Sequence, residues 1–219
     1  GLARIEFILS AEVGIHPLAL LHYEALCQYH DSGVIAPELA QFARGLERMD
    51  ADKWDDLCRA IDLRLGAHSS PRKIFINKLQ EGVGLICAAF YPRPVLVRLS
   101  DFKSNEYREL LGGEVFEPVE ENPMIAWRGA SRYVDPRFSP AFAMECEALR
   151  GVIEEYGLDN LQLMIPFCRS PEEGVAVKQV LEENRLGQEN GVPLYIMVEL
   201  PSNVIEAERF IDEMELFGG

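Results

Sequence analysis

The strongest constraint on the fold is a pair of continuously apolar segments near the carboxyl end of the chain, at residues 161–167 and 194–200. Each is short enough for a strand, and a helical pattern led by a proline follows each one, at Pro171 and Pro201. Strands that lack alternating polar residues are buried on both faces, which is typical of parallel sheets covered by helices. The sequence therefore predicts an α/β domain built on a parallel sheet.

Three further strands are predicted earlier in the chain, at residues 2–9, 95–99 and 124–128. The predicted helices lie between and after the strands, from Pro17 onward and at 37–49, 50–65, 70–90, 140–156, 171–184 and 201–214. Asp50 and Ser70 are predicted N-caps, because each side chain can accept a hydrogen bond from the first helical turn. No internal repeat or linker divides the sequence, so residues 1–219 are predicted to form a single domain.

Composition excludes several classes of partner. Of the 219 residues, 48% are hydrophobic, yet no run of about 18 apolar residues occurs, so a membrane span is not expected. No signal peptide is visible. The formal net charge of −15 would repel nucleic acid and anionic membranes, so neither is an expected partner.

The cysteines and histidines do not form a recognisable metal or disulfide pattern. The five cysteines are scattered without a CxxC pair, which favours reduced, mostly buried thiols in a cytoplasmic protein. The four histidines show no metal-ligand spacing, so a zinc site is not expected. We interpret His16 and His22 as structural rather than as phosphoryl carriers.

Arg98 is the most informative polar residue, because it ends the apolar run 95–97 and a polar loop follows it, in VRLSDFKSNEY at 97–107. An arginine at the carboxyl end of a strand points into the mouth of an α/β barrel, where its planar fork can grip phosphate or carboxylate. Asp101, Lys103 and Asn105 follow in the loop and are expected to support it. Arg98 is thus a candidate anion-binding residue.

Five segments carry a resemblance to a known family. They are GLARIEFIL at 1–9, SPRKIFINKLQEGVGLICAAFYPRPVLVRLSDFKSNEY at 70–107, ENPMIAWRGASRY at 121–133, LMIPFCRS at 163–170 and IMVELPSN at 196–203. In this order they resemble the phosphoenolpyruvate (PEP) synthase family, in the C-terminal barrel of the PEP-utilising enzymes. The resemblance is loosest between residues 24 and 68. It implies an incomplete (β/α)8 barrel of TIM type, with about five of the eight strands present.

The resemblance also implies site residues. Arginines at the strand ends bind substrate in that family, and the matching positions here are Arg4, Arg98 and Arg128. Three guanidinium groups on one face would neutralise a phosphoryl group and a carboxylate together. Glu199 matches a substrate-site glutamate that coordinates Mg²⁺ with an aspartate from the next strand. That aspartate is absent from this sequence, so weak metal affinity is expected.

The implied function is that of the barrel portion of a pyruvate, water dikinase. Such an enzyme converts pyruvate, ATP and water into PEP, AMP and phosphate, and its barrel transfers a phosphoryl group from a phosphohistidine to the pyruvate enolate. The expected partners are therefore pyruvate or PEP, together with the phosphohistidine and nucleotide-binding domains, which this sequence does not contain. The chain resembles a truncated piece of such an enzyme, and by itself it is expected to be inactive.

Other interpretations stay open. Pyruvate phosphate dikinase and the PEP-dependent sugar phosphotransferase have a similar barrel, although the SDFKSNEY segment favours the synthase. A non-catalytic relative and a stand-alone pyruvate-type aldolase barrel are further alternatives. Exposed strand edges would also allow a homo-oligomer.

Two expectations concern the surroundings of the site. Residues 112–122 are acidic and contain a proline, so they are predicted to form a surface loop. Glu6 and Arg132 lie close in sequence to the candidate arginines, and we expect them to form salt bridges that hold those arginines in place.

Overall fold

The sheet of the domain has four parallel strands, in the order β1–β2–β3–β4. They come from a computed structural model that describes residues 1–66, 70–125 and 127–214. The strands are β1 (Leu2–Arg4), β2 (Val95–Arg98), β3 (Leu161–Ile165) and β4 (Leu194–Ile196). Within the described residues the sheet stays open, with β1 and β4 at its edges. The predicted α/β class is confirmed, and the open sheet agrees with an incomplete TIM-type barrel.

Strands β1 and β2 are neighbours although more than 90 residues separate them in the sequence. They pair in parallel, as the barrel interpretation predicts, with Leu2 opposite Leu96 and Arg4 opposite Arg98. This register places the last residue of one strand beside the last residue of the other. Two candidate arginines therefore leave the sheet at the same edge.

The first strand is shorter than predicted, and two helical turns follow it. These are α1 (Ile5–Ile8) and a π-helical turn, η1 (Leu9–Val13). Ile5, Leu9 and Val13 are buried, and their spacing of four residues is a helical stripe. The strand predicted over 2–9 is therefore confirmed for residues 2–4 only, because the apolar residues that follow fit a helical stripe as well as a strand.

The strand predicted at 124–128 was also wrong for the residues that the structure describes there. They form turns and bends, and β2 pairs directly with β3, so no strand separates the two in the described part of the chain. The segment is instead held by side chains. The carbonyl oxygen of Trp127 accepts a hydrogen bond from Arg132, and the amide of Trp127 donates to Glu120.

Helices make up most of the remaining described chain. Their ranges are α2 (Pro17–Leu21), α3 (Tyr23–Ser32), η2 (Pro37–Phe42), α4 (Ala43–Leu46), α5 (Ala51–Leu65), α6 (Pro71–Phe90), α7 (Ser104–Glu109), α8 (Gly113–Phe116), α9 (Ala130–Val134), α10 (Ser139–Glu154), α11 (Pro171–Glu183), η3 (Gln188–Asn190), α12 (Pro201–Ile205) and α13 (Ala207–Met214). The predicted caps Asp50 and Ser70 are confirmed, because their side chains accept the amides of Lys53 and Lys73. The predicted helices 37–49 and 201–214 are each divided in two.

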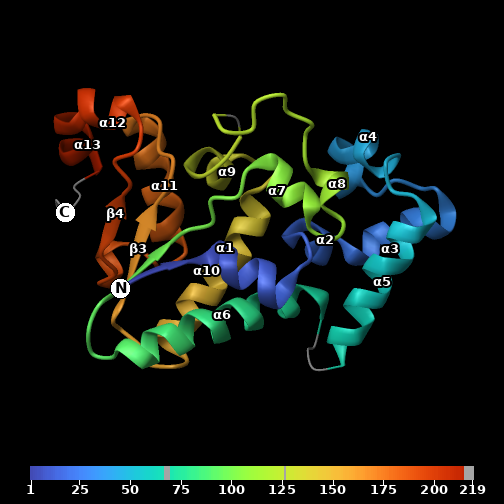
Figure 1. Cartoon of the computed structure of the whole chain (residues 1–219), viewed down its shortest axis with the longest axis horizontal. Coiled ribbons are helices and arrows are strands. Elements are labelled where there is room, and N and C mark those ends of the chain that lie inside the picture. The colour runs from blue at the N-terminus through green and yellow to red at the C-terminus, as the bar shows by residue number, and fades with distance from the viewer. Residues whose placement is uncertain (67–69, 126, 215–219) are drawn as a thin grey trace.

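Some helices pack around the sheet, and others lie at a distance from it (Figure 1). Helices α6 and α10 pack against each other beneath the sheet, and α11 to α13 lie beside β3 and β4. Helices α3 to α5 lie at the opposite end of the molecule, far from the sheet. No described helix is long and apolar enough to cross a membrane.

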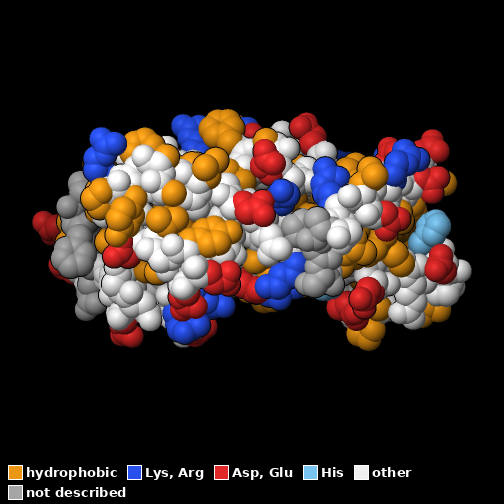
Figure 2. Space-filling view, turned by 90° about the horizontal axis from the view of Figure 1, so that it is seen from below, with side chains coloured by type: hydrophobic (Ala, Val, Ile, Leu, Met, Phe, Trp, Pro, Cys, Tyr) orange, Lys and Arg blue, Asp and Glu red, His pale blue; other side chains and the backbone are white. Residues whose placement is uncertain are grey.

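The surface mixes apolar and charged side chains, as the view from below shows (Figure 2). Several large apolar side chains are exposed near the sheet edges, including Leu2 in β1 and Val198 after β4. Phe7 on α1 and Leu85 on α6 are also exposed.

Candidate anion-binding site

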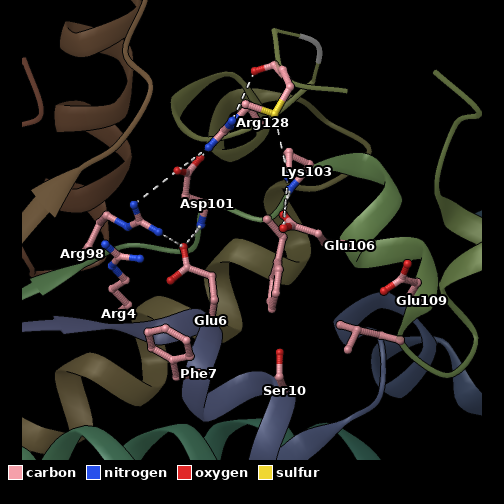
Figure 3. A pocket seen from close by; sticks show the side chains of 13 residues that line it. Arg4, Glu6, Phe7, Ser10, Arg98, Asp101, Lys103, Glu106, Glu109 and Arg128 are labelled. Atoms are coloured by element: carbon pink, nitrogen blue, oxygen red, sulfur yellow. Dashed lines mark hydrogen bonds and ion pairs between the residues drawn. The ribbon is translucent and has the colours of Figure 1, made fainter. Parts of the chain in front are cut away.

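A cavity of about 660 Å³ opens at the carboxyl ends of β1 and β2 (Figure 3). Its lining includes all three candidate arginines, Arg4, Arg98 and Arg128, together with the carboxylates of Glu6 and Asp101. The carboxyl ends of parallel strands meet at one edge of a sheet, and ligand sites in open and closed α/β folds lie there. Strand pairing thus brings Arg4 and Arg98 together, whereas Arg128 reaches the cavity from the turn before α9.

Arg98 is held by two carboxylates. Its Nη2 donates to Glu6 Oε1 at 2.7 Å, and its Nη1 lies 3.5 Å from Asp101 Oδ2. The expectation that Glu6 would hold an arginine is therefore confirmed. Arg4 lies beside Arg98 in Figure 3 and is more exposed, with its guanidinium carbon 5.9 Å from the centre of the Phe7 ring.

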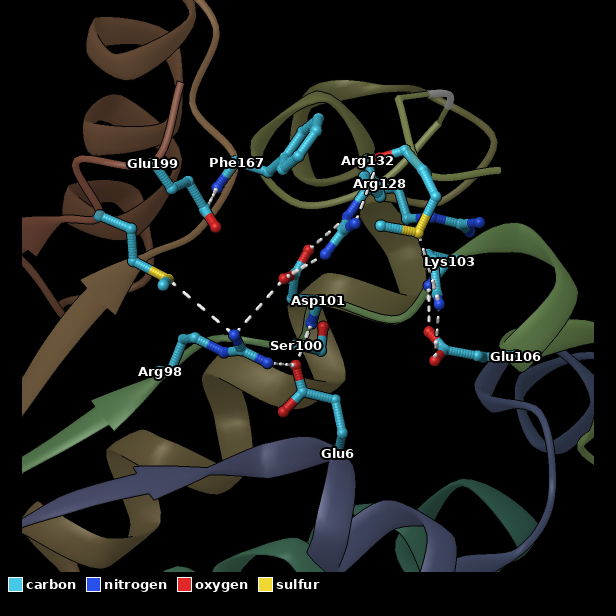
Figure 4. Close-up of polar contacts among 12 residues, drawn as sticks. Glu6, Arg98, Ser100, Asp101, Lys103, Glu106, Arg128, Arg132, Phe167 and Glu199 are labelled. Carbon is cyan, nitrogen blue, oxygen red and sulfur yellow. Dashed lines mark hydrogen bonds and ion pairs between the residues drawn. The ribbon is translucent and has the colours of Figure 1, made fainter. Parts of the chain in front are cut away.

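Asp101 links Arg98 to Arg128. It forms a two-bond pair with Arg128, from Nε at 2.9 Å and from Nη2 at 2.7 Å (Figure 4). The backbone amide of Asp101 donates to Glu6 Oε1 at 2.6 Å. The Asp101 side chain is almost fully buried. Glu6 holds the backbone of the loop after β2, and Arg128 holds the Asp101 side chain. The sequence assigned Asp101 only a supporting role for Arg98, and the structure adds the link to Arg128.

Charged side chains of both signs line the cavity. Three guanidinium groups face the carboxylates of Glu6 and Asp101 at the strand ends, whereas Glu106 and Glu109 lie on α7 at the other end of the cavity, with Lys103 beside Glu106. Burial acts to lower the pKa of Arg128, but its bonds to Asp101 and the nearby charge of Glu199 outweigh burial and raise that pKa. Burial also raises the pKa of Glu6, against the opposing charge of Arg98. Arg128 therefore stays charged, while Glu6 is easier to protonate than an exposed glutamate.

The polar groups of this site are not saturated by protein contacts. Among the described residues, Arg98 Nε and Glu6 Oε2 are buried without a hydrogen-bond partner. Buried polar atoms are nearly always paired, and exceptions concentrate at sites with a functional role. The strand-end cluster is thus an incomplete hydrogen-bond network that faces a cavity.

Glu199 lies beside this cluster but does not line the cavity. It follows β4, and its Oε1 accepts the backbone amide of Phe167 at 2.7 Å. The described residues contain no group of three or more histidine, cysteine or acidic side chains arranged for a metal ion. The described residues therefore do not by themselves complete a magnesium site around Glu199.

Arg132 does not hold the site arginines, contrary to the prediction. It is fully buried and makes a two-bond pair with Glu117, at 2.8 and 2.6 Å. Glu117 also bonds His16 Nε2 at 3.1 Å, in agreement with a structural role for that histidine. The surface loop predicted at 112–122 was wrong at its centre, because α8 and Glu117 are buried there. A buried acid needs a cation, and the tertiary fold supplies one from 15 residues away.

Sequence reasoning missed Glu145, a buried residue of α10. Its Oε1 accepts the amide of Ser100 at 3.0 Å, directly beneath the loop that carries Asp101. Tyr133 donates its hydroxyl to the carbonyl oxygen of the same serine at 2.6 Å. Burial raises the pKa of Glu145 to about 7. The only signal in the sequence was an acid within an otherwise apolar helix face.

Comparisons with known proteins agree with the geometry. The family described as PEP-utilising enzyme, PEP-binding domain, matches residues 42–218. The chain belongs to this family. It is 45% identical to the phosphoenolpyruvate synthase of Aquifex aeolicus over 96% of the chain, and 46% identical to that of Synechocystis sp. over the whole chain. The phosphoenolpyruvate synthase of Escherichia coli is 40% identical over 99% of the chain.

The chain spans about a quarter of the length of these relatives, from 24% to 27%. Because the cavity is built from β1, β2 and the loops that follow, the described chain contributes one wall of a barrel mouth rather than a closed one.

Proposed function

We propose that the strand-end cavity binds PEP or pyruvate, and that the chain is the substrate-binding barrel portion of a PEP-forming phosphotransferase. The observation that carries this proposal is the convergence of Arg4, Arg98 and Arg128 on one cavity. A planar guanidinium group binds carboxylate and phosphoryl oxygens through paired hydrogen bonds. The names of the relatives support PEP as the ligand.

The proposed chemistry is phosphoryl transfer to an enolate. The enolate oxygen of pyruvate would form a bond to phosphorus while the bond from phosphorus to a histidine nitrogen breaks. In such reactions the protein mainly positions the reactants and stabilises charge. Arg98 and Arg128 would hold the anionic oxygens, and Glu6 and Asp101 would hold the arginines at fixed angles.

Other parts of the reaction require groups outside this chain. A bound Mg²⁺ would supply charge neutralisation, with Glu199 as one carboxylate ligand beside substrate oxygens. The phosphohistidine and the ATP-binding site would come from other domains of a longer enzyme, which would work in the cytoplasm in the gluconeogenic direction. We therefore expect the 219-residue chain alone to form no PEP from pyruvate, ATP and Mg²⁺. Sustained PEP production above that of a heat-treated sample would contradict this assignment of roles.

Binding of PEP to the isolated chain tests the proposal. We expect the phosphorus NMR signal of PEP to shift on titration with the chain, with a dissociation constant on the order of 1 mM, because one barrel wall binds weakly. Arg98→Ala should weaken binding about ten-fold or more, since a charge-assisted hydrogen bond is lost. Arg59→Ala is the matched control, because Arg59 is an exposed arginine on α5 that does not line the cavity.

Two results would overturn the proposal. One is the absence of any PEP binding by the folded wild-type chain. The other is equal binding by the wild-type chain and Arg98→Ala, which would remove Arg98 from the site. Oxalate, which resembles the pyruvate enolate in its two adjacent oxygens, should compete with PEP for the same cavity.

A further inference from the structure

Phe167 has an unusual backbone conformation at the edge of the proposed site. It follows β3 and has a φ of 50°, in the left-handed region that bulky residues rarely adopt. A conformation of this kind is unfavourable for a bulky residue, and it persists only where the surroundings enforce it. Such residues concentrate at functional sites, so the contacts that enforce this one are informative.

Two backbone contacts enforce the conformation. The amide of Phe167 donates to Glu199 Oε1, and the carbonyl oxygen of Pro166 accepts the amide of Ala130 at 3.1 Å. Gly129 makes the second contact possible, because a Cβ at that position would lie 2.7 Å from Phe167 Cβ. The turn before α9 therefore approaches the end of β3 more closely than any residue with a side chain would allow.

The ring of Phe167 contacts two arginines. The guanidinium carbon of Arg128 lies 4.4 Å from the ring centre, and that of Arg169 lies 4.8 Å from it. A cation over an aromatic face is attracted by the ring, and more strongly where water is excluded. Each arginine also has an acidic neighbour, Asp101 for Arg128 and Glu173 for Arg169, which offsets repulsion between the two cations.

The hydrogen bonds of Arg128 are made to other groups than the ring. Asp101 accepts from Nε and Nη2, and Nη1 donates to the Met124 carbonyl oxygen at 3.2 Å. Asp101 and Met124 thus hold the guanidinium group through its N–H bonds, and the Phe167 ring adds a contact with the cation (Figure 4).

We propose that Phe167 is a positioning residue, whose strained backbone and ring together set the directions of Glu199 and Arg128 at the mouth of the cavity. The backbone amide orients the carboxylate, and the ring orients the guanidinium group. Glu199 follows β4 and Arg128 precedes α9, so a single residue between these two segments fixes their relative placement. The link to substrate rests on the proposed function, whereas the link to the two side chains does not.

Replacement of the ring tests the first contact. Phe167→Leu keeps an apolar side chain but removes the aromatic face, and Phe167→Tyr keeps the face. In nitrogen–proton NMR spectra of the chain, the Arg128 Nε–H signal should carry a ring-current shift in the wild type and in Phe167→Tyr, and should lose it in Phe167→Leu. PEP binding should weaken about five-fold in Phe167→Leu and recover in Phe167→Tyr.

Replacement of the carboxylate tests the second contact. Glu199→Gln keeps the shape of the acceptor but removes its charge, so the amide of Phe167 should exchange its proton about ten-fold faster. Glu206→Gln is the matched control, because its carboxylate pairs with Arg209 on the surface. Unchanged exchange at Phe167 in Glu199→Gln would show that the carboxylate does not hold this amide.

A variant that only lowers stability must give a different NMR result from Phe167→Leu. Phe75→Leu removes a buried ring of α6 outside the cavity lining, so it should lower the melting temperature without changing the Arg128 signal. An Arg128 signal that is unchanged in Phe167→Leu would overturn the inference, whether or not PEP binds. Failure of the wild-type chain to bind PEP would overturn the proposed function while these NMR contacts remain.

Discussion

Two arginine clusters use the same type of side chain in opposite ways, although Arg128 of the strand-end cluster and Arg132 of the buried cluster are close in sequence. In the buried cluster, Arg132 donates from all three guanidinium nitrogens, to Glu117, Ser104 and the Trp127 carbonyl oxygen. Aromatic rings also cover it, and the closest is the indole of Trp127, 4.0 Å away. In the strand-end cluster, Arg98 has a buried Nε without a partner among the described residues.

The comparison separates a saturated ion pair from an arginine that the proposed function assigns to ligand binding. Arg132 and Glu117 saturate each other away from the cavity, so no ligand is needed to complete them. Arg98 is held by Glu6 but keeps a buried Nε without a partner among the described residues at the edge of the cavity. Saturation of hydrogen bonds, rather than residue type or burial alone, therefore distinguishes Arg132 from Arg98.

The largest expected effect is on stability in the buried cluster. Arg132→Ala leaves Glu117 buried without its cation, so the free energy of unfolding should fall by about 3–5 kcal/mol in urea denaturation. The double change Arg132→Leu with Glu117→Leu should cost less than Arg132→Ala, because no charge is stranded. If Arg132→Ala lowers the free energy of unfolding by less than about 1 kcal/mol, the buried pair does not stabilise the fold as the comparison requires.

The next effect is on function in the strand-end cluster. In a complete PEP-forming enzyme that carries this segment, Arg98→Ala should lose about 2–4 kcal/mol of transition-state stabilisation, measured as a fall in kcat/KM. Its effect on unfolding should be smaller than that of Arg132→Ala, since Arg98 is only partly paired. Near-normal turnover by Arg98→Ala would remove this residue from the site.

A pH effect sharpens the comparison between two buried carboxyl groups. Burial acts to raise the pKa of Glu117, but Arg132 outweighs burial and holds that pKa below its usual value. Glu145 has no cation partner, and burial raises its pKa from 4.5 to about 7, with a further contribution from the Glu6 charge. Glu145 therefore binds its proton more tightly in the folded state than in the unfolded state.

The sign of the pH dependence follows from this shift. Stability from the protonated Glu145 is complete below about pH 4.5 and is lost as the pH rises through about 7. Glu145→Gln cannot ionise but still accepts from Ser100. Relative to this variant, the wild type should lose about 2 kcal/mol of unfolding free energy between pH 5 and 8. Tyr107, Tyr133 and Cys146, which also surround Glu145, stay protonated over this range because burial raises their pKa values. Parallel pH profiles for the two proteins would contradict the assignment.

The smallest expected effect is at an exposed arginine. Arg59 pairs with Asp56 on the surface of α5, at 3.2 Å, and water screens such pairs. Arg59→Ala should change the unfolding free energy by no more than about 0.5 kcal/mol and should leave PEP binding unchanged. A larger effect would show that arginines outside both clusters also contribute to stability or to PEP binding.

Local features were predicted correctly where the determining groups are close in sequence. Asp50 and Ser70 begin helices because a side-chain oxygen reaches an amide three residues away, which needs no tertiary contact. The same reasoning failed for residues 5–13, where a run of apolar residues fits either a strand or a buried helix. The substrate role of Arg4, Arg98 and Arg128 and the metal role of Glu199 stay predictions.

The sequence by itself determined that this chain forms a parallel α/β fold and that arginines end two of its strands. Its motifs also resemble those of the PEP-utilising enzymes. Apolar periodicity and short motifs carry that information, because strand ends in a parallel sheet share one edge. Only the tertiary structure decided which carboxylate meets which arginine. Glu6 reaches Arg98 across 92 residues, and Glu117 takes Arg132 into the core. Pairing of buried charges depends on distances after packing, and sequence separation does not encode those distances.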